Sequence, residues 1–216
     1  MAAEPHFFRV SLSGFRQETY TRAHRGGDIK TVKRNMELLA AAARRAGRKT
    51  YLEAFYHRYI YNRDEEADAR AFSEALGFNF ASTWGMLMPA EKILAMVGDP
   101  AGGVPVTETD HEVAATLSIG LRQALLMSRL KASPRCELLE QQLVLDVKGD
   151  VFLCCGTTSA AANRIGNFLE LSIDEIQAKK REKEICTACM NHGIHHYFIS
   201  QEQFSNFARV EGRGEG

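Results

Sequence analysis

The sequence predicts an α/β protein with a metal-binding module in its C-terminal part, on two observations. Strand-like and helix-like segments alternate along the first half of the chain, in units of about thirty residues. Cys136, Cys154, Cys186 and Cys189 follow, and no cysteine precedes Cys136. The alternation is typical of parallel strands joined by right-handed helical crossovers. The cysteine spacing is typical of one metal site.

Local signals place the elements of the first half. Residues 6–12 are predicted to form a strand that ends at a Ser-Gly turn. Asp28 is suited to cap the next helix, and Gly47 to end it. Further segments are expected in the order strand, acidic helix, strand and helix, over residues 50–61, 64–77, 78–84 and from Pro89 onward.

The second half begins with a Gly- and Pro-rich stretch over residues 99–109, which we interpret as a linker. Apolar residues at helical spacing predict one helix over residues 110–131. Residues 143–153 predict a β-hairpin with Gly149 at the turn. Ser172 and Glu175 form a capping-box pattern for a helix ending near residue 181.

Composition limits the classes of function. The 216 residues are 45% hydrophobic and 25% charged, and 27 basic residues balance 27 acidic ones. Neutral charge gives no electrostatic reason to expect a nucleic-acid partner. The chain has no apolar run of about twenty residues and no signal-peptide pattern, so we predict a cytoplasmic protein without a membrane span. Cysteines in that compartment are more often ligands or thiols than disulfides.

The four cysteines form the candidate metal site. A hairpin brings together its two ends, next to Cys136 and Cys154, and the Cys186-x-x-Cys189 pair would close the site. Core thiols or a redox dithiol are the alternatives. Zinc ribbons use two tight pairs, so the wide first spacing favours iron–sulfur, with zinc as the alternative metal. Cys155 is expected to face away from Cys154.

The chain resembles the C-terminal half of a radical S-adenosylmethionine (SAM) enzyme with a SPASM/twitch auxiliary-cluster domain. Cys136, Gly149, Cys154 and the C-x-x-C pair match the SPASM pattern, and so does "IGNFLELSIDEI". "VSLSG" and "ETYTRAHRGGDIKTVKRNMELL" are similar to later strands and helices of the radical-SAM barrel. The resemblance therefore implies a partial β/α barrel over residues 1–98, a linker and connecting helix over 99–131, a cluster domain over 132–200 and a tail over 201–216.

The resemblance implies one auxiliary [4Fe–4S] cluster on the four cysteines. In a full SPASM domain the next cysteine would fall at His195. With four thiols available, we interpret His195 and His196 as surface or packing residues. The C-x3-C-x2-C loop that cleaves SAM does not occur in the sequence, so we do not expect catalysis by the chain alone. The alternative is a zinc-stabilised, non-catalytic binding module.

Ser11, Ser13, Asn62 and Glu53 would lie where barrel strands of the family approach SAM. An ordinary role at turns and strand ends is the stronger interpretation of these residues. SAM would bind only if the missing part of the barrel were supplied, by an N-terminal segment or by a partner. Aromatic residues of the half-barrel would otherwise form an exposed apolar patch, namely Phe7, Tyr51, Phe55 and Tyr59.

Overall fold

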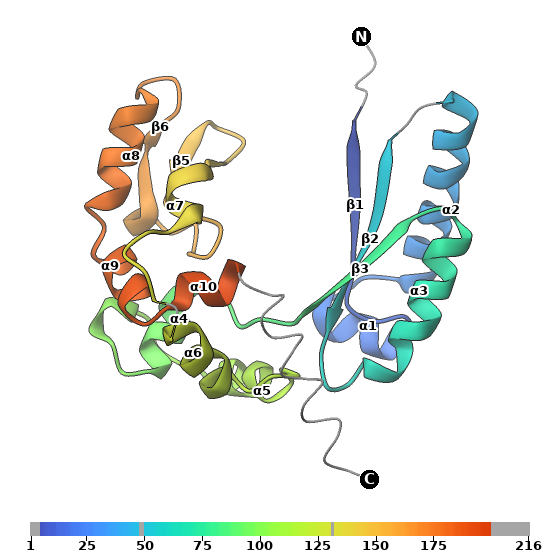
Figure 1. Cartoon of the computed structure of the whole chain (residues 1–216), viewed down its shortest axis with the longest axis horizontal. Helices are drawn as coiled ribbons and strands as arrows, with labels where there is room; N and C mark the ends of the chain where they lie inside the picture. Colours follow the sequence, from blue (N-terminus) through green and yellow to red (C-terminus); the bar gives the residue numbers. More distant parts are fainter. Residues whose placement is uncertain (1–4, 48–49, 131, 200–216) are drawn as a thin grey trace. The chain divides into compact units, whose positions relative to one another are not determined.

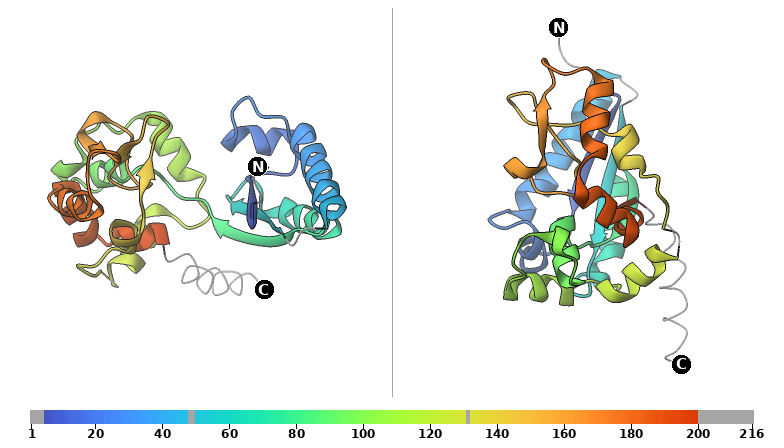
Figure 2. Two further views of the ribbon diagram at one scale, coloured as in Figure 1. Left: turned by 90° about the horizontal axis from the view of Figure 1, so that it is seen from above. Right: turned by 90° about the vertical axis from the view of Figure 1, so that its left-hand side faces the viewer.

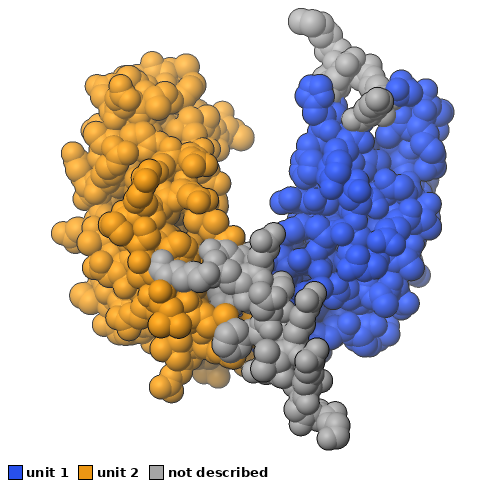
Figure 3. Space-filling view, viewed as in Figure 1, with its two compact units in different colours: residues 1–85, 116–118 blue, residues 86–115, 119–216 orange. Residues whose placement is uncertain are grey.

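The computed structural model describes residues 5–47, 50–130 and 132–199, and the predicted tail at 201–216 lies outside them. The chain divides into two compact units, coloured separately in Figure 3. Unit 1 comprises Met1–Gly85 with Thr116–Ser118, and unit 2 comprises Met86–Ala115 with Ile119–Gly216. Most of the predicted linker region therefore belongs to unit 2, while the division at residue 98 stays a prediction about domain organisation.

Unit 1 is built on a three-stranded parallel sheet (Figure 1). The strands lie in the order β1-β2-β3, which confirms the parallel strand–helix arrangement. The elements are β1 (Phe7–Leu12), α1 (Gln17–Ala23), α2 (Ile29–Ala46), β2 (Tyr51–Arg58), the 3-10 helix η1 (Arg63–Glu65), α3 (Glu66–Ala75) and β3 (Asn79–Trp84).

The predicted caps of α2 are confirmed. The Asp28 carboxylate accepts hydrogen bonds from the backbone N–H groups of Lys30 and Thr31, at 3.0 and 3.2 Å. Gly47 ends the helix in the left-handed conformation, with φ 62°. Helix α1 was not predicted, because its seven residues carry no capping side chain and only Tyr20 is buried.

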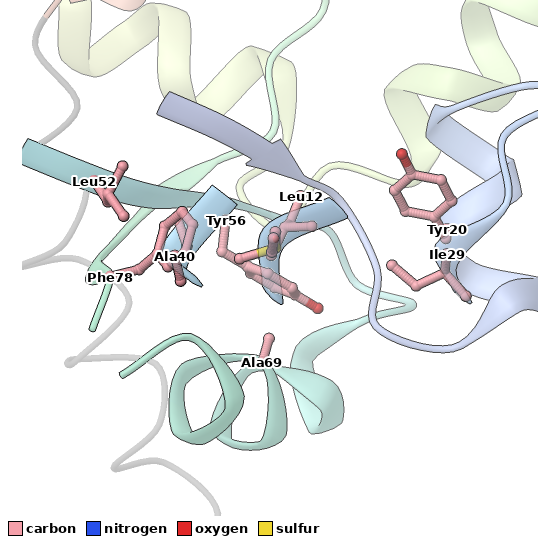
Figure 4. Packing of buried hydrophobic residues seen from close by; sticks show 10 residues of the cluster. Leu12, Tyr20, Ile29, Ala40, Leu52, Tyr56, Ala69 and Phe78 are labelled. Carbon is pink, nitrogen blue, oxygen red and sulfur yellow. The ribbon is translucent and has the colours of Figure 1, made fainter. Parts of the chain in front are cut away.

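Helices α2 and α3 cover one face of the sheet (Figures 1 and 2). Leu12, Leu52 and Tyr56 from the strands are buried against Ala40 of α2 and Ala69 of α3 (Figure 4). These strand residues alternate with those of the other face. On that other face Phe7 and Tyr51 stack at 5.5 Å and stay 48% and 46% exposed. The expected apolar patch is therefore present only in part, at this pair, because Phe55 and Tyr59 are half-buried.

Unit 2 combines helices with a small antiparallel sheet, ordered β4-β5-β6. Its elements are α4 (Ala90–Met96), η2 (Pro100–Gly102), α5 (Glu108–Ala115), α6 (Leu121–Arg129), α7 (Glu137–Gln141), β4 (Val144–Leu145), β5 (Asp150–Phe152), η3 (Ala161–Asn163), β6 (Arg164–Asn167), α8 (Ile173–Arg181), α9 (Glu184–Asn191) and α10 (Ile194–Ile199). The predicted hairpin is β4–β5, with Gly149 at φ 80° in the turn. Strand β6 extends this sheet and was not predicted.

The single helix predicted over residues 110–131 is wrong. The segment folds as two helices, α5 and α6, separated by residues 116–120. Leu117 forms an antiparallel bridge with Tyr59, and the Thr116 carbonyl accepts a hydrogen bond of 3.0 Å from the Ile60 N–H. These pairings belong to unit 1 and replace the hydrogen bonds that a continuous helix would make. The tertiary contacts therefore interrupt the helix, although the apolar residues keep helical spacing throughout the segment.

Candidate metal centre

All four predicted cysteine ligands line one cavity inside unit 2. Cys154 directly follows the hairpin and belongs to the loop after β5, while Cys136 immediately precedes α7. Cys186 and Cys189 lie in α9. Three residues apart on a helix, they share one face. The fold thus brings two segments near the hairpin and one helix face to the same cavity.

Burial sets the protonation of these thiols. It is the largest cause of the raised pKa of Cys136, Cys154, Cys186 and Cys189, and nearby thiolates add to it for Cys186 and Cys189. The pKa of Cys186 rises to about 12. Burying four thiolates together is unfavourable unless a positive charge is present. A metal centre supplies such charge.

A buried lysine lies beside the cavity. The Lys180 side chain of α8 has no solvent exposure, and its ammonium donates a hydrogen bond of 2.6 Å to the Gln142 carbonyl. Burial lowers the pKa of Lys180, and the nearby thiolates of Cys154, Cys186 and Cys136 oppose that shift. The predicted capping box on Ser172 and Glu175 is confirmed at the start of this helix.

The loop after Cys154 is held by a carboxylate that sequence reasoning missed. Glu91 of α4 is buried and accepts hydrogen bonds from the Thr158 hydroxyl at 2.7 Å and from the Asn163 amide at 2.6 Å. The Gly156 N–H in the same loop donates to Cys154 Sγ at 3.3 Å. No local signal marks Glu91, because its partners lie far away in the sequence. Cys155 is exposed and does not line the cavity.

His195 is buried, which agrees with the packing alternative of the prediction and not with the surface alternative. Its side chain is 1% exposed and lines the same cavity as the four cysteines, so it is not a surface residue. Neither ring nitrogen has a hydrogen-bond partner. Burial lowers the pKa of the ring, so it is neutral at pH 7 with one N–H donor and one bare nitrogen.

The cavity does not resemble a preformed mononuclear site. Over residues 5–47, 50–130 and 132–199, no group of three or more histidine, cysteine, aspartate or glutamate side chains is arranged to hold one metal ion. A zinc ion draws its four ligands to about 2.0–2.3 Å from a single point. A multi-iron cluster instead stands between its thiolates and is ligated at separate irons. The four cysteines line one cavity from three separate segments of unit 2.

A family model for SPASM, an iron–sulfur cluster-binding domain, matches residues 136–197. This region is a SPASM domain. The match begins at Cys136 and includes all four cavity cysteines as well as His195. It does not extend to the parallel sheet of unit 1. Comparison with curated proteins and with solved structures found no match.

The other predicted site residues lie in unit 1. Ser11 and Ser13 are at the carboxyl end of β1, Asn62 follows β2, and Glu53 is near the amino end of β2. Ser13 is buried, and its hydroxyl lies 3.2 Å from His57 Nδ1 and 3.2 Å from His24 Nε2. Ser11 is exposed on β1. Sequence reasoning missed both histidines, although His57 shares a strand face with Glu53 and Phe55 by alternation.

Asn62 is fully buried, and backbone groups occupy its amide. The amide nitrogen donates to the carbonyls of Ser13 and His57, both at 2.9 Å, and the amide oxygen accepts from the Tyr59 N–H at 2.8 Å. Glu53 is also buried and pairs with Arg9. Through these contacts, Asn62 and Glu53 stabilise the fold of unit 1. No helix among the described residues is long and apolar enough to cross a membrane.

Proposed function

We propose that the SPASM domain holds one [4Fe–4S] cluster on Cys136, Cys154, Cys186 and Cys189. The observation that carries this proposal is the convergence of four half-buried thiols on one cavity within the matched region. Four thiolates complete the coordination of four irons. Bound in this way, a cluster supplies electron storage, electron transfer or structural support rather than an open iron for SAM.

The residues around the cavity suit this role. Apolar side chains such as Leu139, Leu153 and Phe198 line it and exclude water. The Gly156 N–H donates to Cys154 Sγ, and the Lys180 cation opposes the accumulated negative charge. Hydrogen bonds to sulfur and nearby positive charge favour the more negative, reduced state of a cluster. The SPASM domain is therefore suited to an auxiliary, electron-accepting centre.

Metal analysis tests this proposal. Protein purified without oxygen is expected to contain about four irons per chain, with matching sulfide and a brown chromophore. Cys136→Ala and Cys186→Ala should lose both, whereas Cys155→Ala is the matched control and should keep them. One zinc per chain and no colour would refute the cluster and leave a zinc-stabilised binding module as the better description.

We also propose that the unit 1 sheet is a partial radical-SAM-type barrel that a further polypeptide segment completes, from a partner or from the same protein. Support comes from its strand–helix order and from its two edges, on β1 and β3, which pair with no further strand among the described residues. The exposed Phe7–Tyr51 stack adds apolar surface to the uncovered face. SAM is expected to bind only to the completed barrel. Tight SAM binding to this chain alone, measured by calorimetry, would contradict the proposal.

A further inference from the structure

His195 stands out in the cavity because it is a polar side chain without a partner. Its ring is 1% exposed, and neither Nδ1 nor Nε2 has a partner at good hydrogen-bond geometry, with the Cys189 backbone as a nearby polar group. Buried polar groups in folded proteins are almost always hydrogen-bonded, since leaving them unpaired costs free energy. An unsatisfied buried imidazole therefore points to a partner that occupies the cavity in the working protein.

The residues that line the cavity limit which chemical groups that partner can offer to His195. Apart from the cysteines and His195, the residues lining it are apolar with the exception of Thr157, whose hydroxyl already donates to the Cys154 carbonyl at 3.0 Å. Among the side chains that line this cavity, the acceptors open to an imidazole N–H are thus sulfur atoms, either of the cysteines or of a group held by them. His195 also borders a second pocket, which is lined by Glu137 and Glu140.

The backbone holds His195 in this position. Gly193 joins α9 to α10 with φ 70°, and a Cβ atom there would lie 2.7 Å from the Ser128 carbonyl oxygen. Farther along α10, the Tyr197 hydroxyl accepts a hydrogen bond of 2.8 Å from the Leu87 N–H. The backbone on both sides of His195 therefore packs against other parts of unit 2.

We propose that the His195 imidazole donates a hydrogen bond to a sulfur of the bound iron–sulfur cluster and raises its reduction potential. This inference rests on the proposed function. Reduction adds negative charge to the cluster and its sulfurs, so an N–H donor stabilises the reduced form more than the oxidised form. Four cysteines already provide one ligand per iron, which leaves His195 the role of a positioned donor rather than an iron ligand.

The test compares two substitutions in the complete, cluster-loaded protein. His195→Phe removes the donor and keeps an aromatic ring, whereas His195→Gln keeps an N–H donor. His111→Phe, at an exposed histidine of α5, is the matched control. Iron and sulfide are measured first, and the midpoint potential follows from redox titration of the visible spectrum.

We expect all variants to hold about four irons. At the wild-type midpoint, His195→Phe should lower the ratio of reduced to oxidised cluster about three- to tenfold, where tenfold is about 59 mV for one electron. His195→Gln should recover part of that ratio, and the control should leave it unchanged. An unchanged potential in His195→Phe at full iron content overturns the inference without affecting the proposed function.

A second measurement, on the His195 ring of the wild-type protein, tests the hydrogen bond to the cluster even if His195→Phe fails to hold a cluster. Protein labelled with 15N-histidine and reduced should show a weak 15N coupling to the cluster in pulsed electron paramagnetic resonance, and His196→Gln and His192→Gln should retain it. A strong coupling would make His195 an iron ligand, and no coupling would remove it from the site; either overturns the inference. Zinc in place of iron in the wild type would refute the proposed function itself.

Discussion

The ammonium of Lys180 donates a hydrogen bond of 2.6 Å to the Gln142 carbonyl, although the Lys180 side chain has no solvent exposure. Gln142 also holds the loop that carries Cys154, because its side-chain oxygen accepts a hydrogen bond of 3.3 Å from the Cys155 N–H. One buried cation is thus tied to the segment that presents Cys154. Burying the Lys180 charge is unfavourable in the cluster-free protein. In the loaded protein the same charge stabilises the negatively charged cluster.

Lys180→Met should separate these two effects. In the cluster-free protein, relief from burying a charge roughly offsets the lost hydrogen bond, so the free energy of unfolding should change by no more than about 2 kcal/mol. In the loaded protein the missing cation should speed cluster loss to an iron chelator by about tenfold, or about 1.4 kcal/mol.

Lys179→Met, at the exposed neighbour on the same helix, is the control and should leave chelation unchanged. Equal chelation rates in wild type and Lys180→Met would show that the lysine serves only the packing of α8.

Thiol alkylation should distinguish the spare cysteine from the four in the cavity. In the cluster-free protein Cys155 should react first with iodoacetamide, because it is exposed. Cys186, with its pKa raised to about 12, should react far more slowly, since the thiolate is the reactive form. Mass spectrometry of peptides at successive times gives the order.

Loading the cluster should then protect all four cavity cysteines and leave Cys155 reactive. Protection of Cys155 in exchange for Cys154 would show that the ligand assignment is wrong by one residue.

Asn62→Ala should destabilise unit 1. The buried amide satisfies two carbonyls and one N–H, and their loss should lower the free energy of unfolding by at least about 2 kcal/mol. Urea denaturation monitored by circular dichroism measures the change. Asn79→Ala is the control, because Asn79 is exposed and makes one longer bond of 3.3 Å to the Leu52 carbonyl.

An unchanged stability in Asn62→Ala, with weaker SAM binding in a completed barrel, would favour a cofactor-binding role for Asn62 instead.

Asp110 should make unit 2 sensitive to acid. Hydrogen bonds from Lys92 and Thr107 lower the pKa of Asp110 from 3.8 to about 2. Because the folded-state pKa is depressed, this stabilisation is present above about pH 4 and is lost as the pH falls through about 2. Asp110→Asn should therefore be less stable than wild type at pH 7, and the difference should shrink between pH 4 and pH 2.

Denaturant unfolding at several pH values measures that difference. Asp174→Asn, which removes an exposed carboxylate in the first turn of α8, is the control for a simple change of surface charge. A difference between Asp110→Asn and wild type that stays constant with pH would contradict the assignment.

Much of the fold follows from short-range chemistry and was predictable. Asp28 and Gly47 bound α2, and Ser172 with Glu175 begins α8, because each acts on backbone groups within a few residues. Alternation along β2 separates buried Tyr56 from its neighbours of the opposite face. The cysteine spacing indicated an iron–sulfur site, and the SPASM match over residues 136–197 agrees with it.

By itself, then, the sequence determined strands β1 to β5, the capped helices and the four thiols, since these depend on neighbours along the chain. Tertiary structure alone decided that Leu117 pairs with Tyr59 and interrupts a helix, and that His195 turns into the cysteine cavity. It also decided that Glu91 secures the loop after Cys154. Each of these three features depends on contacts between residues that are distant in the sequence. There, the free energy of burial and hydrogen bonding is larger than the conformational preference of the local segment.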